Sequence, residues 1–159
     1  MVDKNQAIID YLLQCPQLRN NPLFFNFTDA KDNSKQLLPL ANDKILDTTF
    51  IDGSVMKRYT FTLIDYRSVA YQAVVNQSGF INENVEELFD TQSIIDWISE
   101  QSKLKNYPNF GDTCEIEDIS VLTDNPNLNG VDTSTKPSLA KYSFSIRVDY
   151  LDTSGRIWN

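Results

Sequence analysis

The stretch from Ala140 to Tyr150 alternates strictly between two kinds of side chain, and no other feature of the sequence constrains the fold as much. Apolar or aromatic residues occupy every second position: Tyr142, Phe144, Ile146, Val148 and Tyr150. Polar or charged residues fill the positions between them: Lys141, Ser143, Ser145, Arg147 and Asp149. Because successive side chains of a strand point to opposite faces, we expect a strand in a sheet that has one covered face and one solvated face.

A turn signal separates two further segments that have the composition of strands. Asp52-Gly53 is a dipeptide typical of tight hairpin turns, and it lies between Lys44–Phe50 and Val55–Ser68. One face of the second segment carries aromatic and aliphatic residues: Tyr59, Phe61 and Leu63. The opposite face is only partly apolar: Arg58, Thr60, Thr62 and Ile64. We therefore expect a hairpin whose longer strand lies inside a sheet.

The N-terminal segment has the spacing of an amphipathic helix. It runs from Asp3, a suitable N-cap, to about Cys15, where the following Pro16 predicts a stop. Its apolar stripe consists of Ile8, Ile9, Leu12 and Leu13. An apolar cluster from Leu23 to Phe27 follows, and we expect it to form an ordered connection or a short strand.

A second helix is expected from Asn84 to about Lys105. Asn84 and Glu87 have capping-box spacing, in which each side chain can bond a backbone N–H at the helix start. Apolar and neutral residues recur at helical intervals: Val85, Leu88, Phe89, Gln92, Ile95 and Ile98. Ile94 and Trp97 widen this stripe, so we expect Trp97 to pack in the core rather than to stack on a ligand.

The remaining segments complete an α+β fold. Cys114–Thr123 is a predicted strand whose apolar phase slips between Ile116 and Ile119, as a β-bulge allows. Residues 124–139 are rich in Asn, Pro, Gly and Thr and predict a long loop. We expect one domain over residues 1–159, with an antiparallel sheet from two β-hairpins and two helices packed on one face, in the order helix, hairpin, helix, hairpin.

Composition excludes several classes of protein. The chain has 159 residues, a mass of 18.2 kDa and 41% hydrophobic residues, and these values suit one globular domain. Its net charge of −8 and the absence of a basic run argue against sequence-reading DNA binding. No stretch approaches the roughly 20 apolar residues of a membrane span, and no secretory leader is apparent. We expect a soluble protein, made in the cytoplasm, with Cys15 and Cys114 as buried thiols in a reducing compartment.

The sequence offers no convincing catalytic constellation. It contains no histidine, which removes the commonest general base and the usual zinc ligands. Asp47, Asp52 and Asp65 could converge on the first hairpin as an acid–base or metal cluster, but surface carboxylates are the simpler explanation, since nothing in the sequence fixes their separation. The acidic residues of the later segments have the same explanation: Glu86, Glu87, Glu115, Glu117 and Asp118. We therefore expect no enzymatic activity and no catalytic, cofactor or metal site.

Several apolar or uncharged segments fit a subunit that packs against copies of itself. Residues 69–80 form a fairly apolar connector, residues 124–139 are uncharged near their middle, and Phe24, Phe25 and Phe27 crowd one region. Contacts between identical subunits use such surfaces. The alternative is that these segments only cover the core.

Four segments together resemble the small tail terminator, or tail completion, proteins of tailed bacteriophages, which are often called minor capsid proteins. They cover about two thirds of the chain, from Lys44 to Leu151, and occur in the family's order and spacing: FIDGSVMKRYTFTLIDYRS, NENVEELFDTQSIIDWISEQ, NYPNFG with CEIEDISVL, and AKYSFSIRVDYLD. The second has the family's Phe, Trp and Gln arrangement, and the last its closing Ala-x-Tyr strand. None is a catalytic signature, and the segment before about Asn42 is less similar.

The resemblance implies a structural role in the virion. Family members form a hexameric ring at the head-proximal end of the tail tube. The ring stops tube polymerisation and offers a surface to the head–tail connector or stopper. The expected partners are therefore copies of the chain, the tail tube protein and the connector, with DNA only passing through the lumen and no membrane contact. Assembly would take place in the host cytoplasm, and we expect the loop at 124–139 to reach a neighbouring ring.

Three alternatives stay open from the sequence. One is another neck component, such as a head-completion adaptor or stopper, although those tend to be more helical or barrel-like. A second is a small enzyme or ligand-binding domain that uses the region of Asp47, Asp65 and Tyr66. A third is a non-virion interaction domain that inhibits a host protein.

Overall fold

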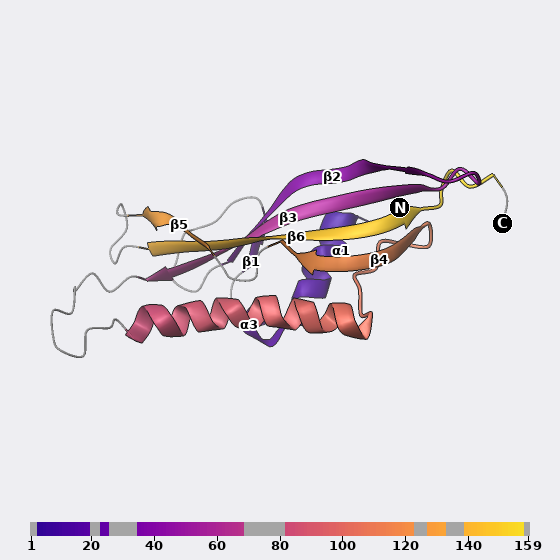
Figure 1. Ribbon diagram of the computed structural model, residues 1–159. Helices are drawn as coiled ribbons and strands as arrows, with labels where there is room; N and C mark the ends of the chain where they lie inside the picture. Colours follow the sequence, from indigo (N-terminus) through magenta and orange to yellow (C-terminus); the bar gives the residue numbers. More distant parts are fainter. Residues whose placement is uncertain are drawn as a thin grey trace.

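One mixed sheet with helices on one face forms the body of the molecule, as the α+β prediction requires (Figure 1). The computed structural model describes residues 3–19, 23–25, 35–68, 82–122, 127–132 and 139–157. The helices are α1 (Lys4–Leu12), α2 (Pro16–Arg19) and α3 (Asn82–Leu104). The strands are β1 (Leu23–Phe25), β2 (Lys35–Thr49), β3 (Val55–Ser68), β4 (Cys114–Val121), β5 (Asn127–Asp132) and β6 (Leu139–Asp152). No helix in these ranges is long and apolar enough to cross a membrane.

Strands β3 and β6 form the centre of the sheet. The order is β1-β2-β3-β6-β4. Strand β5 pairs with the same edge of β6 as β4 does, but with a different part of that strand, and every pairing except β1–β2 is antiparallel. The β3–β6 register is unbroken from Val55↔Asp152 to Ser68↔Leu139. The predicted faces are confirmed, because the aromatic and aliphatic positions of both strands are buried.

Strand β2 begins at Lys35, so the predicted start at Lys44 was wrong. Its pairing with β3 extends back to Lys35↔Asp65, and its register shifts near Pro39, Ala41 and Thr49. These irregularities interrupt the two-residue alternation by which a strand is recognised in sequence. Backbone pairing with the long β3 therefore determines the length of β2.

The predicted loop at residues 124–139 contains a strand, which is a second correction. β5 (Asn127–Asp132) pairs with the first part of β6, while β4 pairs with the last part, so β4 and β5 follow one another along the same edge of β6. The first residues of β6 would otherwise leave their backbone groups on this side unpaired. The predicted bulge in β4 is confirmed by the register shift between Ile116 and Asp118.

The helix boundaries follow the capping chemistry with one exception. Asp3 accepts a hydrogen bond of 2.9 Å from the Asn5 N–H as the N-cap of α1. Pro16 lies at the first position of α2, where its missing N–H costs nothing. Helix α3 starts at Asn82 rather than at the predicted Asn84, and the side chains of Asn84 and Glu87 lie outside the described residues.

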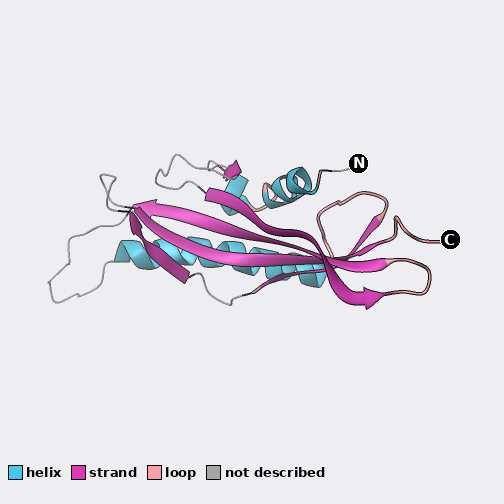
Figure 2. Cartoon of the chain, turned by 90° about the horizontal axis from the view of Figure 1, so that it is seen from above, coloured by secondary structure: helices cyan, strands magenta, loops and turns pink. Residues whose placement is uncertain are grey.

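Helices α1 and α3 share one hydrophobic core with the sheet, and α3 runs along the sheet's length (Figure 2). The buried residues of this core include Ile8, Leu12, Leu18, Leu37, Tyr59, Phe61, Leu63, Ile94, Ile98, Ile119, Phe144, Ile146, Val148 and Tyr150. Trp97 packs against the core with its ring 5.3 Å from that of Tyr11, as the predicted apolar stripe requires.

A fully buried ion pair ties β2, β3 and α3 together. The Lys35 Nζ lies 3.2 Å from an oxygen of Asp65, and neither side chain is exposed to solvent. The buried Thr91 hydroxyl of α3 donates to the other Asp65 oxygen at 2.8 Å. Because a charge in the interior is tolerated only with a partner of opposite sign, the pair fixes how these three elements meet.

We predict that Lys35→Met destabilises the fold by about 3–5 kcal/mol, because it leaves the Asp65 carboxylate buried without this cation. The double variant Lys35→Met/Asp65→Leu should regain most of that loss, since apolar side chains then occupy the site. Urea unfolding measures both effects.

The matched control is Lys57→Met, which removes a half-exposed ion pair with Asp152 and should cost about 1 kcal/mol or less. Equal losses for Lys35→Met and Lys57→Met would contradict the importance of the buried pair.

Candidate functional site: the braced hairpin tip

The three carboxylates singled out in the first hairpin do not converge. Asp52 lies in the β2–β3 turn, whereas Asp65 lies near the far end of β3, and Asp47 belongs to β2 with a side chain outside the described residues. In the described ranges no group of three or more His, Cys, Asp or Glu residues could hold a metal ion.

Asp65 and Tyr66 point to opposite faces of the sheet, as neighbouring strand residues do. Asp65 is bound to Lys35 in the interior, whereas the Tyr66 hydroxyl donates to the Gln36 side chain at 2.8 Å. The ligand-binding alternative based on Asp47, Asp65 and Tyr66 therefore has no common site among the described side chains.

The other acidic residues and the thiols have ordinary surroundings. Glu115 and Glu117 are exposed on β4, as predicted for a strand that presents acid to solvent, but Asp118 is half-buried and accepts a 2.8 Å bond from Ser102. Neither cysteine forms a disulfide in the described part of the chain, and the predicted burial is confirmed for Cys15 alone. Cys15 is buried, which raises the pKa of its thiol, whereas Cys114 is half-buried.

The most elaborate polar network lies at the turn between β2 and β3. We call residues 50–54 and 153–157 together the hairpin tip. The predicted turn at Asp52-Gly53 is present, and Gly53 has φ +90°. The Phe50 N–H donates to the Ser54 carbonyl at 2.9 Å, and the Asp52 carboxylate accepts from both the N–H and the hydroxyl of Ser54, at 3.0 and 2.5 Å. The turn is thus closed by its own backbone and side chains.

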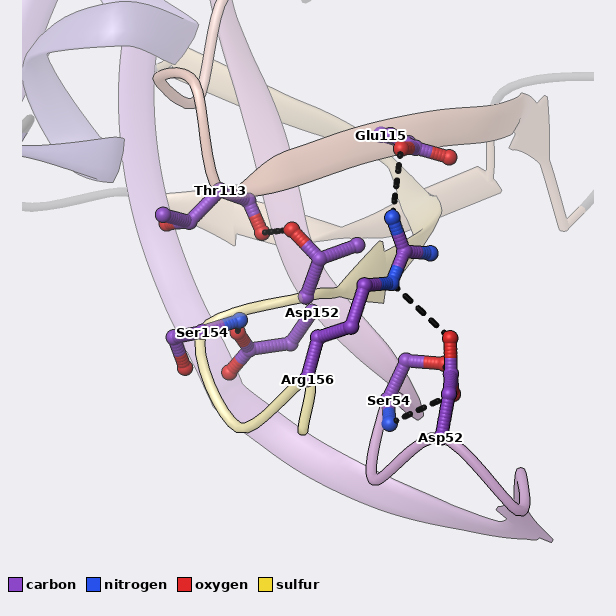
Figure 3. A network of polar contacts seen from close by, with 8 residues as sticks. Asp52, Ser54, Thr113, Glu115, Asp152, Ser154 and Arg156 are labelled. Atoms are coloured by element: carbon purple, nitrogen blue, oxygen red, sulfur yellow. Dashed lines mark hydrogen bonds and ion pairs between the residues drawn. The ribbon is translucent and has the colours of Figure 1, made fainter. Parts of the chain in front are cut away.

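The segment that follows β6 clamps this turn from outside (Figure 3). The Arg156 guanidinium donates to Asp52 at 2.8 Å and lies 3.8 Å from Glu115, and the Ile157 N–H donates to the Asp52 carbonyl at 2.7 Å. Gly53 and Gly155 are in close contact, since a Cβ at position 53 would lie 2.3 Å from the Gly155 carbonyl oxygen. Position 53 therefore requires glycine, whereas a Cβ at position 155 would make a tight contact of 3.1 Å with the Gly53 carbonyl oxygen.

The carboxylates of this network are held in their charged form. Hydrogen bonds from Ser54, with a further contribution from Arg156, lower the pKa of Asp52. Partial burial opposes ionisation of Asp152, but hydrogen bonds from Lys57 and Ser154 outweigh it and lower its pKa to about 2. Each of these carboxylates already has hydrogen-bond partners. The network is therefore suited to stabilising the turn and not to general acid or base catalysis.

Apolar side chains project from this braced frame. Phe50 is 46% exposed, Ile51 is 90% exposed and Ile157 is 73% exposed. A shallow hollow of about 550 Å³ lies beside them and is lined by Phe50, Ile51, Asp52, Ser54, Leu151 and Arg156. Clustered exposed apolar side chains of this kind are typical of interaction surfaces.

The residues that clamp the turn were not predicted from the sequence. Asp52-Gly53 was predicted as a turn, but Gly155, Arg156 and Ile157 lie about a hundred residues further along the chain. The only local signal was the short Thr-Ser-Gly stretch after the last strand. The other surfaces proposed for subunit packing lie mostly outside the described residues: residues 69–80, residues 124–126 and 133–138, and the side chains of Phe24, Phe25 and Phe27.

No protein-family model matches the chain, and no curated protein matches it in sequence. Its function must therefore be argued from the arrangement of its own residues and from the resemblance of its four segments.

We predict that Gly53→Ala destabilises the protein by about 1–3 kcal/mol, because the new methyl group meets Gly155 and the backbone has a positive φ. Thermal unfolding measures the loss. Gly111→Ala is the control, since Gly111 has φ +99° but lies outside the tip. A loss at Gly53 no larger than that at Gly111 would show that the contact with Gly155 is unimportant.

We predict that Asp152→Asn removes part of the acid sensitivity of the fold. The folded-state pKa of Asp152 lies below the ordinary 3.8, so its stabilising effect is present above about pH 4 and is lost as the pH falls towards 2. The variant should be less stable than the wild type at pH 6 and similar to it near pH 2. Urea midpoints across this range test the prediction, with the exposed Asp112→Asn as control. Parallel curves for wild type and Asp152→Asn would contradict it.

Proposed function

We propose that this chain is a bacteriophage tail terminator, a structural virion protein that forms a hexameric ring at the head-proximal end of the tail tube. In this role the ring ends tube polymerisation and offers a docking surface for the head–tail connector. The observation that carries the proposal is the order and spacing of the four resembling segments. These segments occupy β3 with its turn, α3, β4 and β6, which lie together in the structure.

The charge of the chain fits this role. A net charge of −8 per subunit would become about sixfold larger in a hexamer, and much of it would face water or the lumen. Like charge repels the phosphate backbone of DNA. A genome could then pass through such a ring without adhering to it.

A ring built from one kind of contact also explains how polymerisation stops. A heterologous contact closes into a ring only when its rotation is suitable, and the two faces of a closed ring are different. One face can then bind the last tube ring while the other binds the connector. We propose that the segment at 124–139 reaches a neighbouring ring.

The nearest alternative is that the chain is a different neck component, such as an adaptor or stopper. A more distant alternative is that it is a non-virion domain. An adaptor or stopper would also form a ring, but its loss would leave tails of normal length without heads. A non-virion interaction domain would be absent from purified particles.

We predict that a phage carrying a stop codon early in this gene produces overlong tails without attached heads, because tube growth is no longer ended. Negative-stain microscopy measures tail lengths, and expression of the wild-type chain from a plasmid is the control that should restore normal particles. Native mass spectrometry of the purified chain should reveal a sixfold species at high concentration. Normal tail length in the stop-codon phage would exclude a terminator, even if the chain forms rings.

A further inference from the structure

The hairpin tip carries exposed apolar side chains on a turn that is held in place by hydrogen bonds. Seven large hydrophobic residues are exposed in the described part of the chain, and Phe50, Ile51 and Ile157 are three of them. Phe50 and Ile51 line the same hollow, and the bond from the Ile157 N–H to the Asp52 carbonyl holds the backbone of Ile157 at the same turn. Scattered exposed residues are normal, but a cluster beside a hollow of about 550 Å³ marks an interaction surface.

The bracing lowers the conformational cost of binding. An unbraced hairpin turn would have to be ordered when it docks, and ordering costs free energy that is subtracted from the affinity. At this tip the turn is already held by Ser54 from within and by Gly155 and Arg156 from outside. The backbone that carries the side chains of residues 50 and 51 is thus already ordered before binding.

The surroundings of the tip identify the chemistry of its partner. The hairpin tip and the residues next to it in the sheet (57–58 of β3, 112–118 at the start of β4, and 149–152 of β6) contain seven carboxylates and three cations, a net charge of −4. The carboxylates are Asp52, Asp112, Glu115, Glu117, Asp118, Asp149 and Asp152, and the cations are Lys57, Arg58 and Arg156. This end of the sheet is therefore acidic. A complementary surface has an apolar pocket with a basic rim.

We propose that the hairpin tip is a plug that inserts Phe50 and Ile51 into an apolar, lysine- or arginine-rimmed pocket of a different virion protein. This inference rests on the proposed function, because it assigns the surface by which the ring is joined to a neighbour. A second copy of the chain is a poorer occupant, since two such tips would bring net charges of −4 together.

The test places the photo-crosslinking residue benzoylphenylalanine at position 51 in cells that produce the phage. The control places it at position 104, because Leu104 is also an exposed apolar residue, at 67%, but lies at the end of α3. After irradiation, mass spectrometry identifies the crosslinked peptide. We expect position 51 to crosslink to a virion protein other than this chain, next to Lys or Arg residues, and position 104 not to do so.

Binding of the identified protein, purified, to the purified chain then measures the contribution of the plug. Ile51→Glu should weaken binding about tenfold or more, while Leu104→Glu should change it less than twofold, and wild-type affinity should fall as salt is raised. The inference would be overturned by a crosslink from position 51 to the chain itself, by no crosslink above the control, or by binding that Ile51→Glu leaves unchanged.

The two proposals can fail separately. If tails of the stop-codon phage have normal length while position 51 still crosslinks to a basic pocket, the terminator role is wrong and the plug stands. If tails are overlong but Ile51→Glu binds and joins heads as the wild type does, the terminator role stands and the plug is wrong.

Discussion

The continuous pairing of β3 with β6 is the interaction on which the rest of the structure depends. Fourteen residues of each strand are in register from Val55↔Asp152 to Ser68↔Leu139, and their alternating apolar side chains form the platform that α1 and α3 cover. The outer strands take their lengths from this pair. β2 extends along β3, and β4 and β5 share the far edge of β6.

The ion pairs at the two ends of this central strand pair differ in their exposure to solvent. Near the end of β3 at Asp65, an ion pair is sealed from water beneath α3, where a lost partner is costly. At the opposite end, Asp52 and Asp152 are paired while partly solvated, and the pairing keeps their charge over a wide pH range. The first arrangement fixes the packing of elements, whereas the second keeps an acidic and rigid surface available to a partner.

The terminator role concerns the whole ring, whereas the plug concerns one contact surface of each subunit. The role follows from the resemblance of four segments that together form the sheet and α3, while the plug follows from exposure, bracing and charge at the tip. Neither needs a catalytic group. In the described residues, two of the candidate carboxylates lie apart: Asp52 in the turn and Asp65 in the interior.

Local patterns in the sequence determined the faces of β3 and β6, the turn at Asp52-Gly53, the bulge in β4 and the two longer helices, because side-chain periodicity and turn preferences act over a few residues. Tertiary structure alone decided the full length of β2, the presence of β5, the buried Lys35–Asp65 pair, and the clamp of Arg156 on Asp52 across 104 residues. Contacts between residues so distant in the chain have no local pattern. They exist only because the β3–β6 pairing brings the ends of the strands together.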